Sequence, residues 1–255
     1  MNKEKENFYT AKSFYKNEVV KNYNKERTES TKWKREQKAA EDIIASFTSN
    51  STFLDLPVGT GRLLPLFRKY DQKVYGVDIS KDMLSYVQES DIDKSCIVEL
   101  LEGDAENIPL PDNSVDAVLS FRLLNLVPFV VFTNIIKEFK RVSSGEIIFQ
   151  IRVNEELSFI ALIVKILLDP RTHLNRIAAY LIGLGKNLFF SSKKENTNDS
   201  GNIHQSYFIH DLEEVLKQLN MNNLTIKQTI EIDKGVDYSK GSYIPYLIFR
   251  CTQDK

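Results

Sequence analysis

The residues best suited to chemistry lie between Phe53 and Pro65. An apolar run, Phe53–Leu56, predicts a buried strand, and the apolar run after Gly61 predicts the opening of a helix. Between them, Gly59 and Gly61 carry no Cβ, so a ligand can approach the backbone closely, and the N–H groups of a helix start would face it. A strand, a glycine turn and a helix opening predict a cradle for a nucleotide-like ligand.

A carboxylate follows at the expected distance. A second apolar run, Val74–Val77, ends in Asp78, about twenty residues after the first strand, where a ribose diol is usually held in nucleotide-binding folds. The competing interpretation of Asp78 is a charge that stabilises a helix N-terminus.

These residues resemble the class I S-adenosylmethionine-dependent methyltransferases. Three blocks carry the likeness within roughly residues 50–150: Leu54–Gly61, Tyr75–Ser80 and Glu102–Asp116. One position departs from the family pattern, since Pro57 stands where the first glycine is usual. Proline fixes φ near about −65° and has no N–H, so this turn cannot use that donor.

The resemblance implies S-adenosyl-L-methionine as the cofactor. It implies that Asp55 orients the loop and the methionine end, that Asp78 accepts from the ribose hydroxyls, and that Asp104 meets the adenine edge. The full set of cofactor-binding residues expected in this way is Tyr23, Asp55, Pro57, Gly59, Gly61, Asp78, Ile79, Asp104, Ala105 and Phe121. No metal ligand is expected.

The elements that must position these residues alternate between strands and helices. The strands are expected at 53–56, 74–77, 96–101, 115–121, 146–153, 223–232 and 242–251, with a helix at 34–47 before them. Ser80 and Asp211 are expected to cap helices. Such alternation implies an α/β fold with a mostly parallel sheet and helices on both faces. With the family's closing antiparallel pair, the expectation is a Rossmann-like, doubly wound, seven-stranded sheet.

We expect one domain over residues 1–255. Its parts are a helical lid at 1–47, a cofactor-binding core at 48–153, a helical insertion at 154–206 after the fifth strand, and a closing helix and strands at 207–255. The insertion is apolar at 157–168 and through much of 174–190, but neither run reaches the ~20 residues of a membrane span. A helical pair that thickens the core, a lid over an apolar acceptor, and a peripheral membrane contact through 157–190 all fit this pattern.

Catalytic residues are harder to assign, because methyl transfer needs alignment and desolvation more than covalent help. Arg122 follows the fourth strand, where it would pair either with an acceptor's carboxylate or phosphate or with a carboxylate of the protein. His204 and His210 precede the last helix and are candidates for a general base, with capping or loop roles as the alternative.

Composition narrows the classes of function. The chain has 255 residues and a formal net charge of −1, so no global field selects nucleic acid. Its two cysteines, Cys96 and Cys251, lack metal-ligand spacing and are expected to be buried free thiols. With no signal peptide in view, a cytoplasmic location is expected, peripheral to the membrane if the insertion contacts it.

The function expected is methyl transfer to O or N of a small or amphiphilic, lipid-like acceptor. Three alternatives stay open. They are a non-catalytic S-adenosylmethionine-binding protein that acts through partners, an RNA methyltransferase, and a nicotinamide-dependent oxidoreductase. The last is disfavoured because Pro57–Gly61 does not match the spacing Gly-x-Gly-x-x-Gly.

Overall fold

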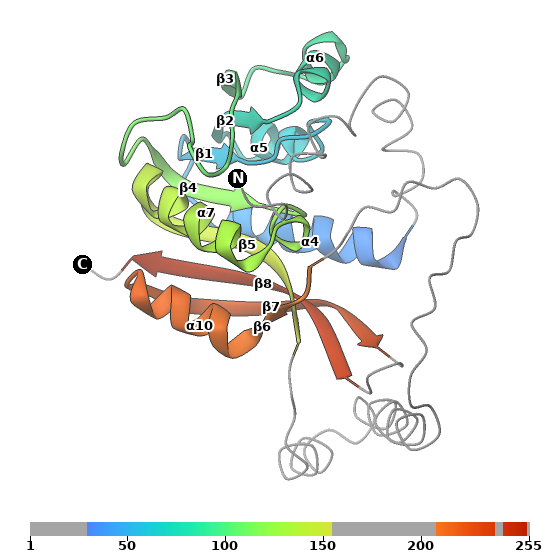
Figure 1. The fold of residues 1–255 in the computed structure, drawn as a ribbon. Helices are drawn as coiled ribbons and strands as arrows, with labels where there is room; N and C mark the ends of the chain where they lie inside the picture. The colour runs from blue at the N-terminus through green and yellow to red at the C-terminus, as the bar shows by residue number, and fades with distance from the viewer. Residues whose placement is uncertain (1–29, 155–207, 238–241, 254–255) are drawn as a thin grey trace, which may run out of the picture.

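The fold is built on one mixed sheet. The structure is a computed structural model that describes residues 30–154, 208–237 and 242–253 (Figure 1). The strand order is β3-β2-β1-β4-β5-β8-β7, and neighbours are parallel from β3 to β5. In that order the strands are Ile97–Glu102, Lys73–Asp78, Thr52–Asp55, Val115–Ser120, Ser143–Asn154, Ser242–Gln253 and Leu224–Asp237. The seven-stranded, mostly parallel sheet expected from the sequence is confirmed.

The last two strands close the sheet in the opposite direction. β8 pairs antiparallel with both β5 and β7, and an additional short strand that was not expected, β6 (His210–Asp211), pairs parallel with the end of β5. β5 is therefore bonded to β4 on one side and to β8 on the other, in the middle of the sheet.

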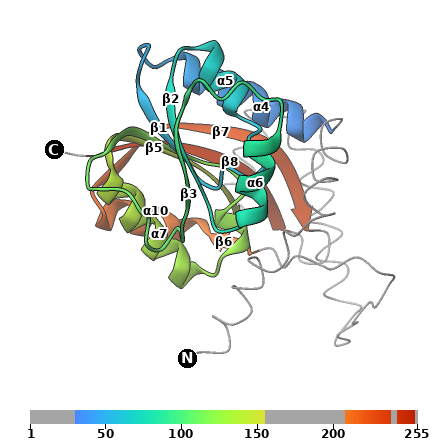
Figure 2. The same cartoon turned by 90° about the horizontal axis from the view of Figure 1, so that it is seen from above.

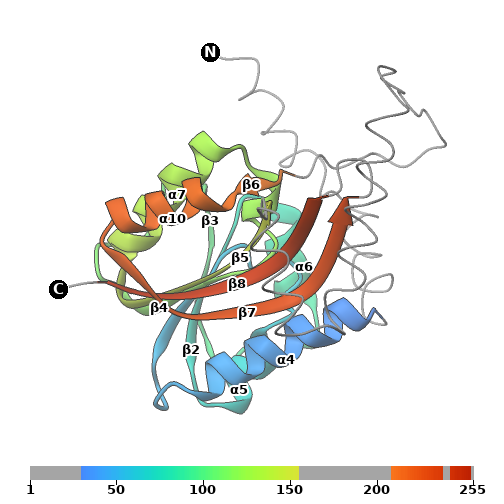
Figure 3. The ribbon, with the colours of Figure 1, turned by 90° about the horizontal axis from the view of Figure 1, so that it is seen from below.

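Helices cover both faces (Figures 2 and 3). On one face lie α4 (Thr31–Ala45), α5 (Leu64–Lys69) and α6 (Lys81–Glu89), whose apolar side chains share a core cluster with Phe53 and Ile148. On the other face lie α7 (Phe129–Val142) and α10 (Leu212–Met221), packed on Phe149 and its neighbours. A short 3₁₀ helix, η1 (Leu124–Leu126), connects β4 to α7.

The helix caps follow the sequence. The Ser80 hydroxyl accepts from the backbone N–H of Met83, and the Asp211 carboxylate accepts from that of Glu214, as expected. α4 begins at Thr31 rather than at residue 34, because Ser30 caps it by accepting from the N–H of Trp33 at 3.1 Å. α5 begins at Leu64, three residues beyond Gly61, so the glycine turn is followed by a further turn before the helix.

The state of the cysteines, groups of metal ligands and membrane-spanning helices can be examined in the described residues. Cys96 and Cys251 are buried free thiols as expected, and burial raises the pKa of Cys251 to about 12. In the described part of the chain, no three His, Cys, Asp or Glu side chains are grouped as metal ligands. None of the described helices is long and apolar enough to cross a membrane. The insertion, and the part of the expected lid before residue 30, fall outside the described residues.

Candidate functional site: the carboxyl ends of the parallel strands

The glycine turn after β1 folds back onto β2. The Leu56–Pro57 peptide bond is cis, and the N–H of Val58 donates to the carbonyl of Val77 at 2.9 Å. Gly59 and Gly61 both adopt a positive φ, of 54° and 76°. A Cβ on Gly61 would meet Leu64 Cδ1 at 2.7 Å, whereas one on Gly59 would find no atom within 4 Å. Gly61 therefore serves packing, and Gly59 borders open space.

Asp78 organises this turn from the end of β2. Its two carboxylate oxygens accept from the backbone N–H groups of Gly59 and Ser80, each at 2.9 Å. Burial raises the pKa of Asp78 to about 6, although these N–H groups and that of Ile79 oppose the shift. A carboxylate can accept about four hydrogen bonds, so acceptor capacity remains for a ligand's hydroxyl groups.

Asp55 ends β1 beside the same turn. It is 2 % exposed, and burial raises its pKa to about 8, while the nearby charge of Arg62 lowers it and that of Asp78 raises it further. Among the described residues none donates a hydrogen bond to its carboxyl oxygens. Asp55 is therefore a buried carboxyl group that a ligand's ammonium or hydroxyl group would stabilise in its charged form.

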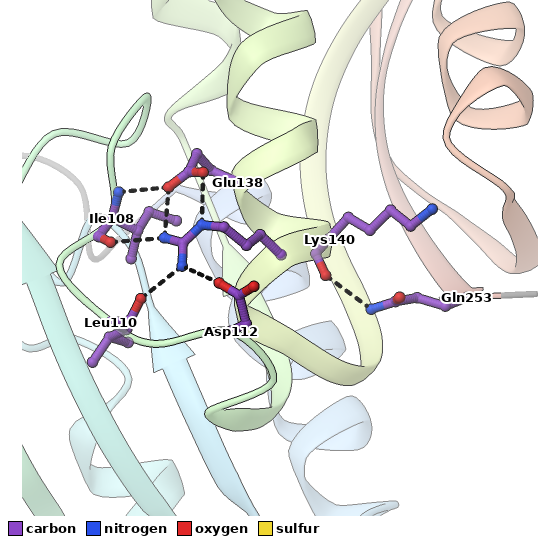
Figure 4. Close-up of polar contacts among 7 residues, drawn as sticks. Ile108, Leu110, Asp112, Glu138, Lys140 and Gln253 are labelled. Atoms are coloured by element: carbon purple, nitrogen blue, oxygen red, sulfur yellow. Dashed lines mark hydrogen bonds and ion pairs between the residues drawn. The ribbon is translucent and has the colours of Figure 1, made fainter. Parts of the chain in front are cut away.

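Asp104 lies on the connection from β3 to β4. Contacts from α7 to Ile108, Leu110 and Asp112 clamp this connection (Figure 4). The guanidinium of Arg141 donates to the carbonyl oxygens of Ile108 and Leu110 and to the carboxylates of Asp112 and Glu138, at 2.8–2.9 Å. Glu138 in turn accepts from the N–H of Ile108 at 2.8 Å. One arginine thus fixes the path of the whole connection.

Within that connection Asp104 forms a tight turn. Its side chain accepts from the N–H of Glu106 at 2.9 Å, and its backbone carbonyl accepts from the N–H of Asn107. Asp104 and Ala105 are half-buried, as is Ile79 after β2. The ends of β2 and β3 lie side by side, since Asp78 pairs with Glu102, and so these three residues come from neighbouring strand ends.

A buried ion network joins α4 to the ends of β4 and β5. Glu36 of α4 is fully buried, and its carboxylate accepts from Arg62 at 3.1 Å and from Arg122 at 2.9 and 2.6 Å. Gln150 of β5 donates to it at 2.7 Å and accepts from the backbone N–H of Arg122. Burial alone would raise the pKa of Glu36, but the two guanidiniums and Gln150 hold it below its usual value.

Arg122 stands at the end of β4 with a φ of 62°, a conformation that is uncommon for residues other than glycine. Of the two partners expected for Arg122, the structure shows the protein's own carboxylate, Glu36. The neighbouring Phe121 is buried on the α4 face with its ring 5.9 Å from the Arg62 guanidinium carbon. Both residues therefore help to hold α4 over the strand ends.

His210 is buried against α7 on the other face. Its Nε2 donates to the carbonyl of Leu124 at 2.8 Å, and its ring lies 5.4 Å from that of Phe132. Burial lowers its pKa, so its neutral form is favoured. In this position His210 anchors the connection between β4 and α7. His204 and Tyr23 lie outside the described residues.

Sequence reasoning missed Glu36, Arg62 and Gln150. A signal for Glu36 was present, because it precedes Ala40 and Ile43 by four and seven residues and therefore lies on the buried stripe of α4. For Gln150 the signal was the apolar Ile148 two residues earlier, which lies on the same face of a central strand.

The residues present fit an adenosyl and amino-acid ligand. Gly59 leaves open space, Asp78 retains acceptor capacity, and Asp55 is a buried carboxyl group without a hydrogen-bond donor among the described residues. Two further buried oxygens at the end of β4, Ser120 Oγ and Asn125 Oδ1, also have no hydrogen-bond partner within the described ranges. All of these groups lie at one edge of the sheet, where open α/β folds bind their ligands.

Comparison with known proteins finds similarity to methyltransferases. Residues 54–149 match the family model described as "Methyltransferase domain". The chain is 33 % identical over 84 residues to malonyl-[acyl-carrier protein] O-methyltransferase of Pectobacterium atrosepticum, and this match covers 32 % of each chain. It is 38 % identical over 77 residues to a ubiquinone/menaquinone biosynthesis C-methyltransferase of Burkholderia multivorans. This match covers 29 % of this chain and 32 % of the relative. The matches thus span about a third of these curated relatives.

A solved structure extends the likeness of fold. Magnesium protoporphyrin IX methyltransferase of Synechocystis, solved with bound S-adenosylhomocysteine, aligns over 97 % of this chain and 100 % of its own with a TM-score of 0.61 and 12 % identity. At that identity the likeness speaks for the fold alone. Residues 54–149 therefore match a methyltransferase domain, and the fold is like that of class I S-adenosylmethionine-dependent methyltransferases.

Proposed function

We propose that this protein transfers a methyl group from S-adenosylmethionine to O or N of a small or amphiphilic acceptor. The observation that carries the proposal is the glycine turn held by Asp78, with Gly59 facing open space beside the buried Asp55. The cofactor supplies an activated methyl on a sulfonium, so the protein's own residues must bind, orient and exclude water.

Each side chain in the turn has a separate task in this proposal. Asp78 accepts from the ribose hydroxyls while its bonds to Gly59 and Ser80 keep the carboxylate in place. Asp55 faces the amino-acid end, where a bound ammonium would favour its ionised form. Asp104 and Ala105, on the connection that Arg141 holds in place, border the adenine together with Ile79, which follows β2. Pro57 completes the turn without donating, and Tyr23 is carried as a prediction from the resemblance.

The acceptor is proposed to enter beyond the end of β4, next to Phe121 and Asn125. The Glu36 network ties α4 to the strand ends beside this region. We assign no general base, since the described contacts of His210 and Arg122 give both a positioning role. An amphiphilic acceptor is supported by two of the relatives, a malonyl-[acyl-carrier protein] O-methyltransferase and a ubiquinone/menaquinone biosynthesis C-methyltransferase.

The rival proposal is a protein of this fold that binds the cofactor without transferring its methyl group. The [4+2]-cyclase SpnF, which aligns over 85 % of this chain with a TM-score of 0.54 and 14 % identity, has a similar fold and a name that indicates a reaction other than methyl transfer. An RNA methyltransferase is less favoured because the net charge of −1 offers no basic surface field.

The test begins with the cofactor site. We expect micromolar binding of S-adenosylhomocysteine to the purified protein by calorimetry, and at least a tenfold loss in Asp78→Asn. Asp91→Asn is the matched control, because Asp91 is exposed just after α6. Absence of binding to folded wild-type protein would overturn the proposal.

The second step looks for transfer itself. Protein supplied with S-adenosylmethionine labelled in the methyl group is incubated with lipid extracts and with small hydroxy and amino acceptors, and products are identified by mass spectrometry. Labelled product that disappears in Asp78→Asn supports the proposal. Cofactor binding with no labelled product from any acceptor class supports the rival.

A further inference from the structure

Two cationic side chains meet at one aromatic ring near the end of β5. The Nζ atom of Lys32, on the first turn of α4, lies 3.0 Å from the centre of the Tyr246 ring. The guanidinium carbon of Arg152 lies 5.2 Å from the same centre. Arg152 of β5 and Tyr246 of β8 are direct partners in the sheet, so the pair is fixed by backbone register, and α4 brings Lys32 onto it.

Among the described residues, three cations, Lys32, Arg122 and Arg152, face two carboxylates at this ring. Around Lys32 lie two carboxylates, Glu36 and Asp233, and two guanidiniums, Arg122 and Arg152. Glu36 already accepts from Arg62, Arg122 and Gln150. Burial lowers the pKa of the Lys32 ammonium to about 8, with the two carboxylates opposing and the two guanidiniums adding to that shift.

Arg152 also carries an unused donor. Its Nε atom is buried and has no hydrogen-bond partner in the described part of the chain. A buried donor without a partner costs free energy, and an ionised one costs more. An acceptor oxygen from a bound molecule would remove this cost and would offset the repulsion between the two cations.

We propose that Lys32 and Arg152, held against Tyr246, form a binding site for an anionic group, a carboxylate or a phosphate, on the molecule that is methylated. The inference rests on the proposed function for its substrate, because it assigns a chemical class to the acceptor. Arginine suits this task since its fork of donors matches the oxygens of carboxylate and phosphate.

The location connects this site to the reaction edge. Arg152 lies two residues after Gln150 in β5, so both side chains project from the same face of the sheet. Gln150 contacts the backbone of Arg122 and the carboxylate of Glu36 at the end of β4. An acceptor anchored at Lys32 and Arg152 would therefore lie next to the strand ends that border the cofactor.

The experiment titrates the full-length protein with decanoate, decyl phosphate and the neutral decan-1-ol, with and without S-adenosylhomocysteine. Calorimetry gives affinities, and fluorescence of Trp33, the single tryptophan and the neighbour of Lys32, gives a local signal. The test variant is Lys32→Gln combined with Arg152→Gln. The matched controls are Lys34→Gln, which removes one positive charge from an exposed position on the same helix, and Lys34→Gln combined with Lys38→Gln, which removes two.

We expect one of the anions to bind at least tenfold more tightly than decan-1-ol, and this preference to vanish in the test variant but persist in both controls. The tighter of the two anions identifies the group as carboxylate or phosphate. Affinity for S-adenosylhomocysteine should change less than twofold in the test variant.

Equal affinity for the alcohol and the anions, or anion binding retained by the test variant, would overturn the inference. So would no anion binding by wild-type protein that binds S-adenosylhomocysteine, a result that leaves the proposed function intact. Failure of S-adenosylhomocysteine binding contradicts the proposed function instead, and the titrations without it still decide whether the anion site exists.

Discussion

Replacing Glu36 by glutamine tests whether the buried ion network holds α4 in place. The change keeps the side-chain volume but removes the negative charge that faces Arg62 and Arg122, whose side chains are only 17 % and 24 % exposed. Removing one partner of a buried ion pair costs roughly 3–5 kcal/mol. Because water reaches part of both guanidiniums, we expect the lower end, about 3 kcal/mol.

The assay is urea unfolding followed by Trp33 fluorescence, which reports on α4, and by far-ultraviolet circular dichroism, which reports on the whole fold. A double-mutant cycle with Arg122→Gln separates the pair from its surroundings. Each single change leaves a buried group unpaired, so the double variant should be less destabilised than the sum of the singles by roughly 2 kcal/mol.

A loss below about 0.5 kcal/mol in Glu36→Gln would refute this reasoning, because changes of that size are typical of surface positions. Strictly additive singles would also refute it. If the fluorescence transition precedes the dichroism transition only in Glu36→Gln, the network acts by docking α4 and not by stabilising the sheet.

Three further predictions concern the cofactor edge. Burial raises the pKa of Asp55 to about 8, so its contribution to the free energy of unfolding is complete below about pH 4 and is lost as pH rises to 8, by up to about 1.4 kcal/mol per pH unit. In Asp55→Asn the melting temperature should not show this loss between pH 4 and 8, and a variant as pH-sensitive as wild type would contradict the prediction. Gly59→Ala should lower the free energy of unfolding only by the strain of a positive φ, about 1–2 kcal/mol, yet abolish S-adenosylhomocysteine binding. Gly61→Ala should be the less stable of the two because its Cβ meets Leu64 at 2.7 Å, and the reverse order of unfolding midpoints would be inconsistent with that contact. Arg141→Lys, which cannot make five hydrogen bonds, should loosen the Asp104 connection and weaken S-adenosylhomocysteine binding several-fold, and unchanged affinity and amide exchange there would show that the clamp is dispensable.

The parts of this fold that the sequence predicts are those with local signals. Ser80 and Asp211 cap the helices they precede, because capping needs only a side-chain oxygen three residues before the N–H it bonds. Asp78 was placed beside the glycine turn because spacing between parallel strands is regular in this class of fold. These features depend on contacts within one helix or between consecutive strands.

The parts that sequence reasoning missed depend on contacts between distant units. Glu36 and Arg122 are 86 residues apart, and nothing near either one names its partner. A charged residue on a helix is usually interpreted as solvent-exposed. For Glu36, only its position on the apolar stripe of α4 indicated burial. The same holds for Arg152, whose meaning depends on Tyr246 from a strand that comes much later in the chain.

The position of β5 has a consequence for synthesis. β5 is complete at Asn154, but the strand that covers its second edge, β8, begins only at Ser242. Until β8 is made, a central strand with Ile147, Phe149 and Ile151 has one edge of unpaired backbone groups, the kind of edge that promotes pairing with other chains. The entropy of closing the loop grows only slowly with its length, so the long intervening segment costs the finished fold little. The long segment matters instead during synthesis, because the edge of β5 stays unpaired in the nascent chain and can pair with other strands until β8 is made.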